Sequence, residues 1–183
     1  MLPQLLARFA NFVGCGLRRA GARHSLNSAQ MNVLVYLSQA NRYSNTPAAV
    51  TEYLGLTKGT VSQTLLTLER GKWIERRPDR RDRRVIRLQL TRNAQRLIAN
   101  FEDSLAEAVP PAQRANLEQT LSACLQSPSM RTFGVCKTCQ SFQREGPSTY
   151  RCGLTLEPLP AAQILKLCRE HSTPASEPIT ING

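Results

Sequence analysis

Two short helical segments separated by a glycine, in the second quarter of the chain, constrain the fold more than any other feature of the sequence. Pro47 follows Thr46, which is the order expected where a capping residue precedes the first residue of a helix. Gly55 interrupts this first segment. Thr57 can then cap a second helix, which we expect to stop at Gly71.

The second helix is predicted to have one apolar face and one polar face. Val61, Leu65 and Leu68 recur at helical spacing and are expected to point inward. Polar and charged residues fall on the other face, namely Thr60, Gln63, Thr67 and Arg70. A helix of this kind packs against a core with one side and leaves the other side free for a partner.

A charged hairpin follows the second helix. Residues 73–77 and 85–90 are predicted as two strands, and Pro78–Arg84 as the charged turn that joins them. Thr91 then caps a long helix that is expected to reach about Val109. Two short helices followed by a hairpin predict a winged helix-turn-helix domain.

Further helices are expected on both sides of this unit. Residues 1–22 form one helix with an apolar stripe, Ser28 can cap another helix, and residues 112–125 continue helical after Pro110-Pro111. The members of the stripe are Leu2, Leu5, Leu6, Phe9, Phe12, Val13 and Leu17. A domain this small offers the stripe no partner, so we expect a second subunit to cover it. The predicted fold class is mainly α with a small β-hairpin wing (α+β), with dimerisation helices at its N- and C-terminal ends.

Three regions are predicted along the chain. Residues 1–126 would be the winged-helix DNA-binding and dimerisation domain, with a boundary at Ser127–Ser129. Residues 127–171 would be a small cysteine-rich extension, and residues 172–183 a flexible tail. The apolar content is ordinary for a folded chain, and no run of eighteen apolar residues predicts a membrane span.

The charge of the chain favours a polyanionic partner. The net charge is +11 and the sequence pI is about 10.1. Between Lys72 and Arg96 there are ten Lys and Arg residues against three acidic residues, so the excess is concentrated on the predicted hairpin. Double-stranded DNA is therefore the expected partner, because a positively charged stripe neutralises phosphates. An anionic membrane surface fits the net charge alone but has no predicted membrane segment to support it.

Two sets of residues are predicted to contact DNA. The second helix of such a pair can enter the major groove, and its first turns carry small polar residues that can approach base edges and phosphates. The hairpin tip places arginines within reach of a minor groove, which attracts arginine where it is narrow. The predicted DNA-contacting residues are Thr57, Lys58, Thr60, Ser62, Gln63, Arg80, Arg81, Arg83 and Arg84.

Residues 28–106 resemble the MarR family of winged-helix repressors. The resemblance depends on the run from Gly71 to Thr91, in which an Asp-x-Arg-Asp-x-Arg wing is followed by a strand, a Leu-Thr pair and a helix. It implies that Asp82 braces Arg84 and that Arg84 inserts into the minor groove. It also implies that Arg81 and Arg83 contact phosphates, and that the flanking helices form a dimer. The resemblance does not reach the last fifty-five residues.

Four cysteines of the C-terminal extension form the second chemical signal. Cys136, Cys139, Cys152 and Cys168 begin with a Cys-x-x-Cys pair and lie within forty residues. So short a segment has little core, and a bound metal would supply the stability that is missing. We expect an iron–sulfur cluster, with zinc as the alternative. The spacing of these cysteines is similar to the ligand spacing of high-potential iron–sulfur proteins.

The remaining metal-ligand residue types have less to support them. His171 could replace one thiolate, although a histidine near a helix end is more often a solvated residue. Cys15 and Cys124 fall on the predicted dimerisation helices and are expected to pack as small apolar side chains. Six cysteines without a secretory signal point to metal or redox chemistry in the cytoplasm, where disulfide frameworks are rare.

The sequence thus predicts a cytoplasmic, sequence-specific transcription regulator, which we expect to be a repressor, acting as a homodimer on a near-palindromic operator. Its cysteine extension would sense redox or iron state, or would clamp the dimer. Two alternatives remain: a redox or electron-transfer protein, and an RNA-binding structural protein. The first lacks a nucleotide- or flavin-binding motif, and the second would need more aromatic residues than the 5% present. No catalytic motif is found, so we expect no enzymatic activity.

Overall fold

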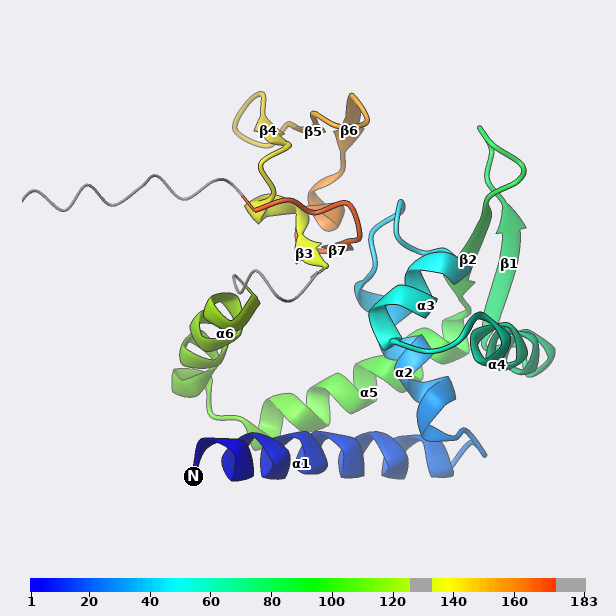
Figure 1. Ribbon diagram of the computed structural model, residues 1–183, viewed down its shortest axis with the longest axis vertical. Helices are drawn as coiled ribbons and strands as arrows, with labels where there is room; N and C mark the ends of the chain where they lie inside the picture. The colour runs from blue at the N-terminus through cyan, green and yellow to red at the C-terminus, as the bar shows by residue number, and fades with distance from the viewer. Residues whose placement is uncertain (126–132, 174–183) are drawn as a thin grey trace, which may run out of the picture.

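The computed structural model describes residues 1–125 and 133–173, and Figure 1 shows their arrangement. The N-terminal two-thirds contain helices α1 (Leu2–Ala22), α2 (Ser28–Gln39), α3 (Pro47–Leu54), α4 (Lys58–Arg70), α5 (Arg92–Ala108) and α6 (Pro111–Leu125). Strands β1 (Ile74–Pro78) and β2 (Ile86–Leu90) form a hairpin between α4 and α5. The described residues are therefore mainly helical with small antiparallel hairpins, which confirms the predicted fold class.

Most of the predicted side-chain caps are found at the starts of their helices. The Thr46 hydroxyl accepts a hydrogen bond from the backbone N–H of Ala49 at 3.2 Å, and Thr57 and Thr91 cap α4 and α5 in the same way. The prediction that Ser28 caps α2 is wrong. Asn27 is the cap, because its side chain and that of Gln30 hydrogen bond reciprocally to each other's backbone N–H groups.

The end of α4 falls at the predicted residue. Gly71 ends the helix with a φ of −74°, and the next residue, Lys72, is left-handed with a φ of 57°. A Cβ atom at Gly71 would lie 2.9 Å from the ring of Trp73. The glycine is therefore required by the close approach of the indole rather than by its own backbone angles.

One apolar core joins the helices to the hairpin. Val61, Leu65 and Leu68 of α4 are buried, as predicted, and they pack with residues of α2, α3 and α5. Ile74 of β1 and Leu88 of β2 fix the base of the hairpin to this core, at 1% and 2% exposure. The hairpin therefore projects from this core, with its tip away from the helices (Figure 1).

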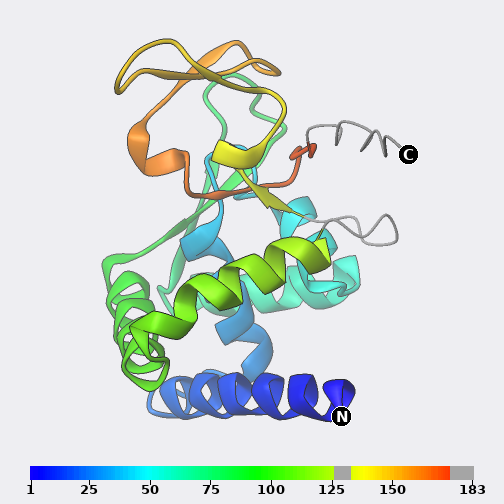
Figure 2. The ribbon, with the colours of Figure 1, turned by 90° about the vertical axis from the view of Figure 1, so that its left-hand side faces the viewer.

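Apolar side chains of α1 remain uncovered in the single chain. Helix α1 runs along the edge of the molecule and crosses α5 (Figures 1 and 2). Only Leu17 and Gly21 of α1 are buried. The exposed large apolar side chains of this helix are Leu2, Leu5, Leu6, Phe9 and Phe12. Leu117 and Leu121 of α6 are exposed as well.

The C-terminal residues 133–173 form a small module of short strands. Strand β3 (Gly134–Val135) pairs with β7 (Leu167–Cys168), while β4 (Phe142–Arg144), β5 (Tyr150–Cys152) and β6 (Glu157–Leu159) form a three-stranded sheet. Two short 3₁₀ helices lie at Cys136–Thr138 and Ala161–Gln163. In Figure 2 this module lies beside the hairpin and above the helices.

The module is attached to the core of the helical part. Phe133 is 8% exposed and makes edge-to-face contacts with the rings of Tyr36 and Tyr53. The backbone N–H of Asn41, after α2, donates to the carbonyl of Leu167 at 2.8 Å. The module therefore shares a continuous core with the first domain.

The predicted boundaries of the module fall partly outside the described residues. The boundary at Ser127–Ser129 lies there, as do residues 174–183 of the predicted tail. Ser172, where the tail was predicted to begin, hydrogen bonds to the module: its carbonyl accepts from Gln140 and its N–H donates to the sulfur of Cys139.

None of the helices in the described ranges is long and apolar enough to cross a membrane.

Candidate nucleic-acid interface and cysteine cavity

The outer face of α4 is free and polar at its N-terminal end. Thr57 accepts a hydrogen bond from the N–H of Thr60, and the two hydroxyls lie 2.9 Å apart. All five residues predicted to contact DNA from this helix are exposed, namely Thr57, Lys58, Thr60, Ser62 and Gln63. The opposite face is held in the core, so the helix is fixed in orientation while this face can meet a partner.

The wing tip displays four arginines around a turn that is braced by aspartate. Arg80, Arg81, Arg83 and Arg84 are all exposed. Asp82 accepts two hydrogen bonds from the Arg84 guanidinium, at 3.0 and 2.9 Å, and one from the Arg84 backbone N–H. These bonds lower the pKa of Asp82 and raise that of Arg84. The brace that the resemblance implied is therefore present, and it holds the guanidinium near the tip of the wing.

A second aspartate organises the wing from within. Asp79 accepts from the backbone N–H groups of Arg81 and Asp82 and from the Arg87 guanidinium at 2.7 Å. The hydrogen bond from Arg87, followed by the two backbone bonds, lowers the pKa of Asp79 to about 2. Arg87 also donates to the carbonyl of Tyr43 at 2.9 Å, so the same side chain ties the wing to the loop before α3.

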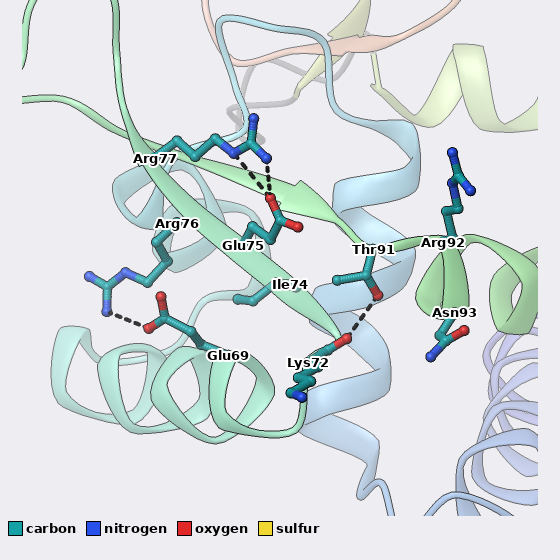
Figure 3. A pocket seen from close by; sticks show the side chains of 9 residues that line it. All are labelled: Glu69, Lys72, Ile74, Glu75, Arg76, Arg77, Thr91, Arg92 and Asn93. Carbon is teal, nitrogen blue, oxygen red and sulfur yellow. Dashed lines mark hydrogen bonds and ion pairs between the residues drawn. The ribbon is translucent and has the colours of Figure 1, made fainter.

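The base of the wing is hollowed beside the end of α4, as Figure 3 shows. Arg76 points toward Glu69 of α4, with 3.8 Å between the nearest charged atoms, and Arg77 pairs with Glu75. The Thr91 hydroxyl donates to the carbonyl of Lys72 at 2.9 Å and closes the base of the hairpin. Basic side chains thus continue from the tip of the wing to its base. At the base, their charge is partly neutralised by Glu69 and Glu75.

Wing residue Arg81 is held by the module. Its guanidinium forms an ion pair with Glu157 of β6. The carboxylate of Glu157 also accepts from Arg42 at 2.7 Å and from the Tyr43 hydroxyl at 2.6 Å. Glu157 is 15% exposed, whereas the Arg81 side chain is 79% exposed. One carboxylate of the module therefore joins the wing to the loop that precedes α3.

The four predicted metal ligands line one cavity. Cys136, Cys139, Cys152 and Cys168 come from four separate positions of the module and surround a cavity of about 40 Å³. Its remaining wall is largely apolar and is completed by Asn41 and Tyr43 from the first domain. Within residues 1–125 and 133–173, no three His, Cys, Asp or Glu side chains converge as they would around a single ion.

Amide groups point at the sulfur atoms of this cavity. The Asn41 side chain donates to the sulfur of Cys136 at 3.2 Å, and the backbone N–H of Ser172 approaches the sulfur of Cys139 at 3.5 Å. The hydrogen bond between Cys136 and Cys168 lowers the pKa of Cys168. The same bond, together with burial, raises the pKa of Cys136.

His171 and the two other cysteines lie elsewhere. The His171 ring lies 3.0 Å from the Thr138 hydroxyl and packs on Gly134, where a Cβ atom would overlap it. It does not line the cavity. Cys15 on α1 accepts a hydrogen bond from Arg18, and Cys124 is exposed on α6.

Several residues of the interface escaped the sequence prediction. Asp79 could have been recognised as an aspartate that accepts from backbone two residues on, which is common at turns. Asn41, Tyr43 and Glu157 carried no local signal, because their partners lie 95 to 115 residues away along the chain. Their roles follow only from the packing of the module against the first domain.

The helix pair, the braced wing and the shared core define the chain's first two-thirds as a winged-helix domain. Three solved structures share this fold. A mutant of MepR from a multidrug resistant S. aureus clinical isolate is 22% identical with a TM-score of 0.57, covering 68% of this chain and 95% of its own. CouR from Rhodococcus jostii RHA1, bound to p-coumaroyl-CoA, is 20% identical with a TM-score of 0.55 over 70% and 94% of the two chains. A MarR transcriptional regulator from Methanosarcina mazei Go1 is 17% identical with a TM-score of 0.51 over 68% and 94%.

The family match agrees with the fold. Residues 24–85 match the model of the MarR family, and this stretch covers α2 to the wing. No curated protein matches the chain significantly. Residues 24–85 are therefore similar to the MarR family, and the solved structures show that the first two-thirds of the chain have the winged-helix fold.

Proposed function

We propose that this protein is a sequence-specific DNA-binding transcription regulator, with repression as its expected mode of action. The observation that carries the proposal is the combination of an exposed polar face on α4 with an aspartate-braced arginine wing. Both are fixed to one core. In this arrangement α4 would read base edges in the major groove, and Arg84 would enter a minor groove.

The proposal includes a homodimer. Five large apolar side chains of α1 are exposed in the single chain, and a contiguous apolar surface of this kind marks an interaction site. A two-fold dimer places two copies of α4 at a fixed separation. The operator is therefore expected to contain two inverted half-sites about one helical turn apart.

The cysteine module is the second part of the proposal. We infer that it binds an iron–sulfur cluster or zinc through Cys136, Cys139, Cys152 and Cys168, and either senses redox or iron state or clamps the dimer. The support is that all four cysteines line one cavity. The module contacts the loop before α3 and the wing, so its state can influence the two elements that are proposed to meet DNA.

The direct test is selection of binding sites from a pool of random DNA duplexes at one fixed salt concentration. The expected result is enrichment of an inverted repeat whose half-sites are spaced by about one helical turn. Enrichment of no motif would overturn sequence-specific binding, and enrichment of a single unrepeated site would overturn the symmetric dimer.

A matched pair of variants assigns the contact to α4. Gln63 and Gln113 are both exposed glutamines on helices, but only Gln63 lies on the proposed DNA-reading face. Gln63→Ala is expected to relax the preference at one position of each half-site, whereas Gln113→Ala leaves the selected motif unchanged. Identical motifs from both variants would argue against base contact by this face of α4.

A further inference from the structure

We propose that the cavity lined by the four cysteines holds a cubane iron–sulfur cluster rather than a zinc ion. We also propose that Asn41 of the winged-helix domain is part of the site, as a hydrogen-bond donor to a ligand sulfur. This deepens the proposed function by choosing between its two metal alternatives. The site is therefore shared between the module and the DNA-binding domain.

The cavity itself separates the two metals. Four thiolates bound to one zinc lie about 2.3 Å from the ion, so their sulfurs almost touch and enclose no further space. Here the four cysteines surround a cavity of about 40 Å³, whereas thiolates in contact around one zinc would leave none. A cluster fills such a space because its iron and sulfide atoms lie between the protein sulfurs, each iron bound to one cysteine.

The lining of the cavity suits a cluster as well. Phe142, Leu154 and Leu159 form much of its wall, and the Phe142 ring stacks on Tyr150 with 5.5 Å between the ring centroids. An apolar wall keeps water away from the bound group. The reduction potential of a cluster depends on such exclusion and on hydrogen bonds to the sulfur atoms.

Asn41 is fixed for its role by bonds that leave its N–H₂ group free to point at sulfur. It is 1% exposed, and its side-chain oxygen accepts from the backbone N–H groups of Tyr43 and Ser44 at 3.0 and 2.9 Å. The amide nitrogen then donates to the sulfur of Cys136 at 3.2 Å. Asn41 is thus a positioning residue: the loop before α3 is shaped by the same side chain that contacts the cluster ligand.

The first experiment measures what the full-length protein binds. The protein is purified without oxygen, its iron, acid-labile sulfide and zinc are determined, and metal-free protein is reconstituted with ferrous iron and sulfide or with zinc alone. We expect about four irons and four sulfides per chain, with a broad visible absorbance. A colourless protein that holds one zinc per chain, or that retains neither metal, would overturn the proposal.

Cysteine variants locate the site. Cys139→Ala and Cys152→Ala are expected to abolish cluster binding and to change operator affinity at least several-fold. Cys15→Ala, which removes a cysteine distant from the cavity, should change neither. Retention of a full cluster by Cys152→Ala would overturn the ligand assignment. An unmodified protein that holds a full cluster but does not bind DNA would instead count against the proposed function. Failure of the ligand assignment and failure of the proposed function are therefore distinguishable.

Asn41→Asp tests the hydrogen bond. The substitution keeps an oxygen for the N–H groups of Tyr43 and Ser44 but removes the donor to Cys136. We expect a lower reduction potential in a variant that still folds and still binds DNA, because an N–H donor stabilises the more negative reduced cluster. An unchanged potential would show that Asn41 does not act on the cluster.

A second inference follows from a different observation, the ion pair between Arg81 and Glu157. We infer that Glu157 restrains the DNA affinity of the wing by occupying Arg81. Glu157 is mostly buried and anchored by Arg42 and Tyr43, so it keeps its position while the exposed guanidinium of Arg81 meets either the carboxylate or a phosphate. This inference rests on the proposed DNA binding.

The placement of Glu157 also connects this restraint with the cavity. Glu157 of β6 is paired in register with Cys152 of β5, one of the four cavity cysteines. Filling or emptying the cavity would therefore act on a residue directly across the strand pair from Glu157. The wing, which is far from the cavity in sequence, is connected to it through two residues.

The test is Glu157→Gln, which keeps an oxygen acceptor for Arg42 and Tyr43 but removes the negative charge. We expect binding to random DNA to become several-fold tighter, and its salt dependence steeper by about one unit of slope, because Arg81 gains a phosphate contact. Adding Arg81→Gln should abolish the gain. Glu145→Gln, which alters an exposed carboxylate paired with Arg151, is the matched control.

Two outcomes would overturn this inference. One is unchanged affinity and salt slope in Glu157→Gln. The other is an equal gain when Glu157→Gln is made in the Arg81→Gln background. Binding that is absent in every variant, including the unmodified protein, would count against the proposed function instead.

Discussion

Leu5→Ala is expected to weaken the proposed dimer by a factor that can be worked out from the exposure of this side chain. Leu5 is 64% exposed in the single chain. The change removes three carbon atoms, about 2.4 kcal/mol of transfer free energy if all were buried by the partner, and the exposed share is about 1.5 kcal/mol per protomer. A two-fold interface counts each residue twice, so the total is about 3 kcal/mol, or roughly 150-fold in the dimer dissociation constant.

Sedimentation equilibrium over a wide concentration range measures this dissociation constant. Leu165→Ala is the matched control, because Leu165 is also a leucine and is 61% exposed, but it lies in the module. We expect the control to leave association unchanged. If Leu5→Ala and the unmodified protein dissociate at the same concentration, or if the unmodified protein is monomeric, then α1 is not the interface and the reasoning from its exposed stripe is refuted.

Three further predictions concern the wing and its base. Arg84→Ala should weaken binding to the operator roughly tenfold to a hundredfold and binding to random DNA less, whereas Arg76→Ala should weaken binding to the two kinds of DNA about equally. If Arg84→Ala binds the operator as tightly as the unmodified protein does, minor-groove insertion is contradicted. The pKa of Asp79, lowered to about 2 by Arg87, means that its contribution to stability is complete above about pH 4 and is lost as the pH falls toward 2. Asp79→Asn should therefore reduce the acid dependence of thermal unfolding in that range, and an unchanged dependence would count against the bond. Gly71→Ala should destabilise the domain by about 1–3 kcal/mol in chemical unfolding, because the new methyl group would meet the adjacent indole ring.

The sequence alone determined the elements whose signals are local. A hydroxyl before a helix competes for the first free backbone N–H groups, so Thr46, Thr57 and Thr91 could be identified as caps from their positions. The apolar spacing of α4 determined its buried face for the same reason, since helical periodicity is fixed by the backbone. The Asp82–Arg84 brace spans only two residues and is a local contact as well.

Local signals were ambiguous where two neighbouring residues could play the same part. Ser28 and Asn27 can both cap a helix, and the choice of Asn27 depended on Gln30 completing the reciprocal pair. At the end of α4, Gly71 could be identified as the stop, but the sequence did not show that the position of the Trp73 ring leaves no room for a Cβ atom there. A ring that folds back onto the helix end is a tertiary contact.

Only the tertiary structure decided how the cysteine module is used. Spacing showed that four thiols could share a metal, but the cavity between them, and the entry of Asn41 into its wall, follow from the packing of residues more than ninety positions apart. The same holds for Glu157, because the sequence gives no sign that β6 places its carboxylate against Arg81 of the wing. Contacts of this kind depend on loop closure between distant segments, and no periodicity or motif in the chain encodes them.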